Sequence, residues 1–333
     1  MSSAPTNPDD PKPDAPKADE PKSLTDKIGA ALPIGLTALA TVFAGMSTSA
    51  LQQAMYWKSQ AAQDQARATN QWTLAGFKRD RALLMQATAA QLRAASGYAP
   101  AAFTLPPLKY APGDAESEKK ARALRTAQEQ AIGWLTEPSG ARAGPPPVKL
   151  PDIADPTVAA LRDAIEQREP ESELVKLAAR IKHDAINKTI DDAEKANEQI
   201  DKDWTPIVRA ANDLVRAQGS FKPDDPDATK KAQAATAAQA AGFDLEERRY
   251  RAESRLNQGL GFLYEIRTKT SSAESDKHRR KSQTLFLAML VAQIGGVVSS
   301  LALARKRKSV LWLLAAIAGL VAIGFGGYVL LDF

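Results

Sequence analysis

Three apolar segments stand out from an otherwise polar chain: residues 28–46, 285–303 and 310–331. None contains a charged residue, and each is long enough to cross a hydrocarbon layer of roughly 30 Å as an α-helix. The block between the first two is polar, charged and rich in alanine. This pattern predicts an all-α membrane protein with three transmembrane helices and a long, coiled-coil-like helical extramembrane domain between the first and the second.

The boundaries of these parts follow from the same pattern. The amino-terminal tail is rich in proline, acids and lysine, so it cannot bury enough apolar surface to become ordered. We predict a disordered tail at 1–27, spans at 28–50, 284–304 and 310–331, an extramembrane domain at 51–283 with proline-rich loops near 97–113 and 138–156, and a basic turn at 305–309.

The first span should continue into water as one long helix, since residues 47–96 contain no proline. We expect its large apolar residues to form a loose buried stripe: Leu51, Met55, Trp57, Ala61, Trp72, Phe77, Leu83, Leu84 and Leu92. Tyr56 and Trp57 suit an interfacial anchor or packing against a neighbouring helix. A signal peptide cleaved after Ala50 is the alternative to an uncleaved anchor, but the apolar run is longer than a signal core.

Further helices are expected between and after the proline-rich breaks. One spans about 114–135, another starts at Pro156, and the last runs from about Ala228 into the second span. The clearest heptad pattern has spacings of four, three, four and three: Ile200, Trp204, Ile207, Ala211 and Leu214. Pro206 should kink or divide that helix. Gly261 should weaken the last helix or allow close approach by another.

Small residues in the last two spans are candidate helix-packing positions. They recur about every four residues, which lets helix backbones approach closely. The candidates are Ala288, Ala292, Gly296 and Ser300 in the second span, and Ala315, Gly319, Ala322 and Gly326 in the third. Each stripe can pack within the chain or drive oligomerisation. Gln293 should hydrogen-bond to Thr37, to Thr41 or to Gln293 of another copy.

Basic residues near the membrane set the expected topology. The short turn formed by Arg305, Lys306, Arg307 and Lys308 contains no acid, so the positive-inside rule places it in the cytoplasm. The amino terminus is then cytoplasmic, and the helical domain and the carboxyl terminus are external. Arg279, Arg280 and Lys281 argue against this placement because they would lie outside, but long domains cross the membrane despite such charges. We expect the protein in a bacterial inner membrane, with both basic clusters at lipid headgroups.

The sequence contains no recognisable catalytic or metal-binding motif. It has no cysteine, and it lacks nucleophile-elbow, Walker, dinucleotide-binding and zinc-protease motifs. His183 has nearby acids but no second histidine, so a solvated polar face is favoured over a metal site. We therefore expect no catalytic, cofactor or metal residues. A net charge of +5, concentrated at membrane boundaries, does not favour nucleic-acid binding.

Two regions resemble the DUF4337 family of bacterial membrane proteins of unknown function. The first is Ala68-Thr69-Asn70-Gln71-Trp72 with Lys78 following, although Asn70 stands where that family has an acid. The second is the carboxyl-terminal pair of spans, with Lys277-His278-Arg279-Arg280, Ala292-Gln293-Ile294, Ser300-Leu301-Ala302 and Leu311-Trp312. The resemblance implies three spans and a helical middle, here much longer than in the family, and implies no activity.

These observations predict a non-enzymatic membrane protein that acts as a helical scaffold. Its partners would be the lipid bilayer and either another copy or a different protein, bound through the helical domain. A channel or transport accessory protein is the alternative, with Gln293, Thr37 and Thr41 lining a pore. A membrane-anchored hydrolase is a third hypothesis, but it lacks a nucleophile–base pair.

Overall fold

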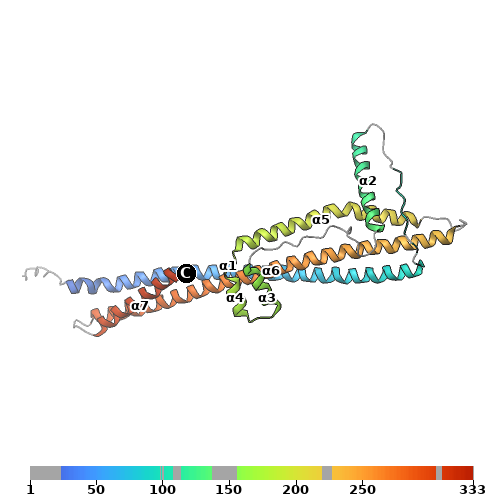
Figure 1. Cartoon of the computed structure of the whole chain (residues 1–333). Coiled ribbons are helices and arrows are strands. Elements are labelled where there is room, and N and C mark those ends of the chain that lie inside the picture. Colours follow the sequence, from blue (N-terminus) through green and yellow to red (C-terminus); the bar gives the residue numbers. More distant parts are fainter. Residues whose placement is uncertain are drawn as a thin grey trace, which may run out of the picture. The chain divides into compact units, whose positions relative to one another are not determined.

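The computed structural model describes residues 24–97, 99, 101–107, 114–136, 156–219, 227–304 and 310–332. Within these residues every regular element is an α-helix, which confirms the all-α class (Figure 1). The helices are α1 (Leu24–Ala95), α2 (Ala115–Thr136), α3 (Pro156–Glu166), α4 (Glu171–Ala178), α5 (His183–Gln218), α6 (Ala228–Ala304) and α7 (Val310–Asp332).

Several helix boundaries agree with the sequence pattern. The structure begins α3 at Pro156 and α6 at Ala228, and it starts α2 one residue after Asp114. One expectation is wrong: residues 24–27, assigned to the disordered tail, are helical. Pro206 does not divide α5, which continues through it as one helix. Residues 1–23, most of the two proline-rich loops and the basic turn lie outside the described residues.

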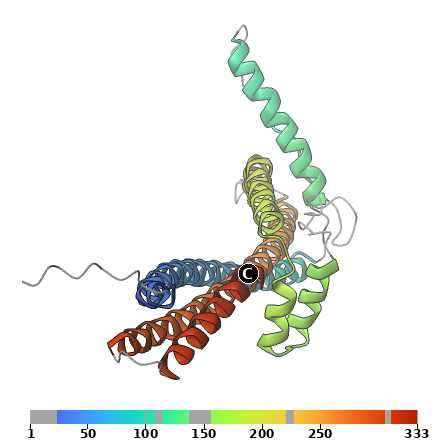
Figure 2. The same ribbon diagram turned by 90° about the vertical axis from the view of Figure 1, so that its left-hand side faces the viewer.

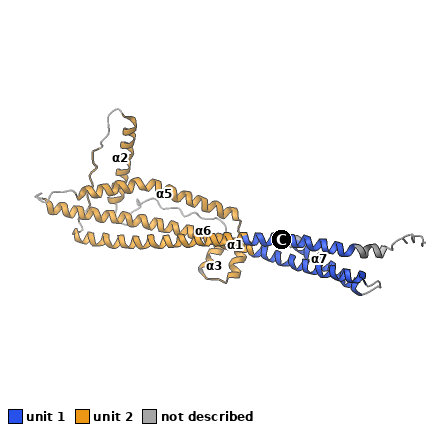
Figure 3. Cartoon of the chain, turned by 180° about the vertical axis from the view of Figure 1, so that it is seen from behind, with its two compact units in different colours: residues 1–55, 276–333 blue, residues 56–275 orange. Residues whose placement is uncertain are grey.

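Two compact units divide the chain, and the long helices α1 and α6 contribute to both (Figure 3). The first unit contains residues 1–55 and 276–333. Three helices among the described residues are long and apolar enough to cross a membrane, and all contribute to this unit: α1 with its start, α6 with its end, and α7. These helices indicate a membrane protein. Their shared core consists of Ala40, Phe43, Leu285, Ala288, Ala292, Ala322 and Val329.

The second unit, residues 56–275, is a helical assembly built on the remaining parts of α1 and α6. In it α5 runs beside α6, and α3 and α4 form a short antiparallel pair (Figures 1 and 2). One core joins α3, α4 and α5 to α1 and α6, with Leu161, Ile186, Ile190, Leu256 and Ile266 fully buried. A second core joins α2, α5 and α6.

Most heptad residues of α5 lie in or beside this second core, whereas Ile200 packs against the first. Trp204, Ile207, Ala211 and Leu214 are buried, and Trp134 of α2 packs edge-to-face on Trp204 with ring centroids 6.1 Å apart. The buried face of α5 therefore contacts α2 and α6.

Candidate functional site

The principal surface of interest is formed by α1 in the second unit, where small residues face inward. Buried alanines recur at strict intervals of seven residues: Ala61, Ala68, Ala75, Ala82 and Ala89. A repeat of seven keeps one narrow face of a helix against its neighbour over many turns. The buried stripe expected from the large apolar residues is wrong, because Trp72, Phe77, Leu83 and Leu84 are exposed.

Small residues on α6 meet this alanine face. Ser254, Gly261 and Thr268 are buried and also lie seven residues apart. The Ser254 hydroxyl donates a hydrogen bond of 2.8 Å to the backbone carbonyl of Ala75. A Cβ atom on Gly261 would lie 3.2 Å from the Trp72 ring, so this glycine permits the close approach that the sequence suggested.

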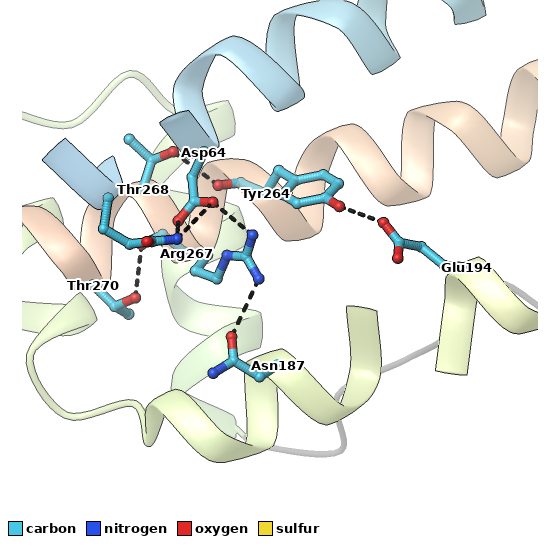
Figure 4. A network of polar contacts seen from close by, with 8 residues as sticks. Asp64, Asn187, Glu194, Tyr264, Arg267, Thr268 and Thr270 are labelled. Atoms are coloured by element: carbon cyan, nitrogen blue, oxygen red, sulfur yellow. Dashed lines mark hydrogen bonds and ion pairs between the residues drawn. The ribbon is translucent and has the colours of Figure 1, made fainter. Parts of the chain in front are cut away.

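A buried ion pair fixes the antiparallel register of α1 and α6. Asp64 is completely buried, and the guanidinium of Arg267 donates to its carboxylate at 2.6 Å (Figure 4). Arg267 also donates to Asn187 of α5 at 3.3 Å, and its guanidinium carbon lies 4.9 Å from the centroid of the Tyr264 ring. The network therefore connects three helices at one level.

Tyr264 extends this network towards α5. Its hydroxyl donates to the carboxylate of Glu194 (Figure 4). Burial, followed by this hydrogen bond and the negative charge of Glu194, raises the pKa of Tyr264 to about 12. The phenol thus stays protonated at neutral pH and acts as a hydrogen-bond donor. Nothing in this arrangement activates it as a base.

The outward face of α1 carries apolar side chains that nothing covers among the described residues. Leu74, Phe77 and Leu84 are 45%, 65% and 61% exposed. Their spacing of three and seven residues places them on one side of the helix. We name this set the outer stripe. Asp80 and Arg81 border it on opposite edges, and neither forms an ion pair with another described residue.

In the membrane unit, the small residues of α7 receive side chains from α1. Ala315 and Ala322 are fully buried, and Gly319 and Gly326 are buried with them. Leu36 lies over Gly319, and the Phe43 ring lies over Gly326, where an added Cβ would come within 2.5 Å of it. This face of α7 is therefore occupied within the chain.

The corresponding positions on α6 are divided between the interior and the surface. Ala288 and Ala292 are fully buried, and Gly296 is buried near Thr37. Ser300 is exposed, and its hydroxyl donates to the Gly296 carbonyl at 2.9 Å.

Gln293 is exposed on the same unit and lines a groove of about 710 Å³ with Thr37 and Thr41. The two threonine hydroxyls donate to the carbonyls of Pro33 and Thr37, one turn earlier in α1. Gln293 has no hydrogen-bond partner among the described residues, so the expected bond to either threonine is not formed.

The remaining candidate residues have simple surroundings. Arg279 and Arg280 are exposed and Lys281 is half-buried, while residues Arg305 to Lys308 lie outside the described part of the chain. His183 lies against Trp57, with ring centroids 4.8 Å apart, so Trp57 packs on a neighbouring helix. Among the described residues, no group of three histidines, cysteines or acids could hold a metal ion.

The sequence interpretation missed the outer stripe and the Asp64–Arg267 pair. The alanine repeat was visible in the sequence and could have shown which face of α1 turns inward. No protein-family model, curated protein or solved structure matches this chain. Fold and geometry therefore define the class, a helical membrane protein with a second unit built around an alanine-lined helix pair. The resemblance to the DUF4337 family stays a prediction.

Proposed function

We propose that this chain is a non-enzymatic, multi-pass membrane scaffold that self-associates through the outer stripe of α1. The observation that carries the proposal is the division of α1 into two faces. Alanines occupy the buried face, while Leu74, Phe77 and Leu84 remain exposed to water. An exposed set of large apolar side chains is typical of an interaction surface.

A second copy of the chain suits this surface because of its charges. Copies anchored in one membrane have the same orientation, so two α1 helices would meet in parallel. In a parallel pair related by a two-fold axis, opposite edges of the two stripes face each other. Arg81 of one copy, which lies 5.7 Å from the centroid of the Tyr250 ring in its own chain, would then lie opposite Asp80 of the other. Asp80 would gain an ion-pair partner that no described residue of the single chain supplies.

Cysteine crosslinking of the full chain in native membranes tests this proposal. The natural sequence has no cysteine, so each variant carries one. Phe77→Cys and Leu84→Cys should give disulfide-linked dimers on mild oxidation. Ala90→Cys, which is exposed on another side of α1, is the matched control and should not. Equal crosslinking at all three positions, or a strictly monomeric chain in lipid nanodiscs, would overturn the proposal.

We also propose the topology expected from the basic turn, with a cytoplasmic amino terminus and an external helical unit in a bacterial inner membrane. A reporter fused after Gly219 and a second at the carboxyl terminus test it. Both reporters should indicate the external side. A cytoplasmic signal after Gly219 would move the interaction surface, and any protein partner, to the inside.

The groove near Gln293 supports a second candidate function, a channel or transport accessory protein. Gln293, Thr37 and Thr41 line it together, and these are the polar groups that an oligomer could turn towards a pore. Single-channel recordings from the purified full chain should then show a conductance that Gln293→Leu alters. A chain without conductance, and unchanged by Gln293→Leu, excludes this function and leaves the scaffold proposal intact.

A further inference from the structure

A pocket in the second unit is lined mainly by charged side chains, unlike the groove near Gln293. It lies between α5 and α6 and has a volume of about 360 Å³. Its lining consists of Thr205, Val208, Arg209, Asn212, Asp213, Arg216 and Arg249. Three guanidinium groups thus face a single carboxylate around a space large enough for a small solute.

Two of these arginines are available for a ligand. Arg209 and Arg216 lie seven residues apart on α5, so they project from the same face two turns apart. Neither forms an ion pair or a hydrogen bond with another described residue. Asp213, which lies between them in the sequence, is not paired with either. The two side chains are exposed and can turn towards an anion without breaking a contact.

The third arginine is held in place from α6. Arg249 donates to the carboxylate of Glu253 at 2.7 Å, and Glu253 also pairs with Lys78 of α1 at 2.6 Å. Burial lowers the pKa of Arg249, but the hydrogen bond to Glu253 and the negative charges of Glu253 and Glu246 outweigh it, so the net pKa is raised. Arg249 is therefore a fixed cation at the wall of the pocket.

We propose that this pocket binds a small phosphorylated solute through Arg209, Arg216 and Arg249. The planar fork of a guanidinium group matches two oxygens of a phosphate, and charge-assisted hydrogen bonds are stronger than neutral ones. The side-chain amide of Asn212 supplies a further donor. The hydroxyl of Thr205 already donates to the Asp201 carbonyl, so it contributes none. The pocket volume suits a phosphate with a small attached group.

Titration calorimetry of the full chain in detergent tests the proposal, with pyrophosphate and glycerol phosphate as probes. The wild-type chain should bind both saturably. The Arg209→Gln/Arg216→Gln variant should lose at least tenfold in affinity. Lys188→Gln/Lys195→Gln is the matched control, since it removes two exposed charges at the same spacing on the same helix, outside the pocket. Circular dichroism verifies that both variants are folded.

Three outcomes decide the question. Loss of affinity in the arginine variant alone supports the pocket. Equal weakening in both variants overturns it, because the attraction is then a general effect of positive charge. No saturable binding of either probe by the wild-type chain overturns it as well. A last experiment measures binding of the chain to lipid vesicles with and without phosphatidic acid. Binding of the vesicles that depends on Arg209 and Arg216, without binding of either soluble probe, would assign the site to a lipid headgroup and overturn the solute proposal.

Discussion

Asp64 of α1 and Arg267 of α6 form an ion pair of 2.6 Å, although 203 residues separate them in the chain. The carboxylate is fully buried, and only 11% of the Arg267 side chain is exposed. Because both charges have left water, the pair stabilises one register of the two helices and penalises others, where either charge would be buried alone. The Nε atom of Arg267 is buried without a partner among the described residues.

This pair gives a prediction for paired substitutions. Asp64→Leu or Arg267→Met alone should lower the free energy of unfolding by about 3–5 kcal/mol, since each leaves an uncompensated buried charge. The double variant should lose clearly less than the sum of the two. Thermal unfolding of the full chain, followed by circular dichroism in detergent, measures all three. Additive losses would show that the two charges act independently.

The buried alanine face gives a second prediction. Ala89 is fully buried and Ala90 is exposed, so the two neighbours form a matched pair. Ala89→Leu should destabilise the second unit by about 1–3 kcal/mol, because three added carbons must push α1 away from its neighbour. Ala90→Leu adds the same atoms on the surface and should leave the melting temperature nearly unchanged. Equal melting temperatures for the two variants would show that this face is not closely packed.

The sequence predicted most of the helices, but it did not predict which of their faces are buried. Proline marked the start of α3, and the lack of proline from residue 47 to residue 96 indicated one long α1. The inward face of α1 was assigned wrongly, because residues such as Phe77 dominate any count of hydrophobicity. Alanine has little apolar surface, so a repeat of alanines adds little to the calculated hydrophobicity of a helix face.

The alanine face of α1 is buried because of the shape of α6, and the sequence of α1 alone contains no information about that shape. Gly261 and Ser254 of α6 provide a surface that only small residues can approach. The burial of Asp64 could not be predicted either, since its cation lies on the other long helix. The same limitation applies to the pocket on α5, where Arg209 and Arg216 are joined by Arg249 of α6.

The membrane unit gives a third prediction, based on two adjacent glycines of α7. A Cβ on Gly326 would come within 2.5 Å of the Phe43 ring, whereas one on Gly327 would meet nothing within 4 Å. Gly326→Ala should therefore destabilise the packing of α1 on α7 by about 1–3 kcal/mol. Gly327→Ala should not. Resistance to unfolding by sodium dodecyl sulfate in mixed micelles is the measurement.

A compensating substitution makes this prediction more specific. Phe43→Leu shortens the side chain that Gly326 accommodates, so it should recover part of the stability lost in Gly326→Ala. The loss of apolar contact in Phe43→Leu alone must be measured as the reference. A double variant no more stable than Gly326→Ala would place the cause of destabilisation elsewhere in α7.

The last prediction concerns the pH dependence of the second unit. Burial raises the pKa of the Glu265 carboxyl above its ordinary 4.5, although the nearby charge of Lys269 lowers it in part. The folded chain then holds this proton at pH values where the unfolded chain has lost it. The free energy of unfolding should therefore fall as the pH rises through the ordinary pKa towards the raised one.

Glu265→Gln isolates this effect, because the amide mimics the protonated carboxyl at every pH. At pH 7.5, well above the ordinary pKa, the unfolded wild-type chain has lost this proton, so folding carries the cost of burying the carboxyl group and the variant should melt at a higher temperature. At pH 4 the wild-type carboxyl is mostly protonated in the folded chain, and the difference should shrink. A difference in melting temperature that stays constant between the two pH values would mean that lost contacts of Glu265, and not the cost of burying its charge, govern the result.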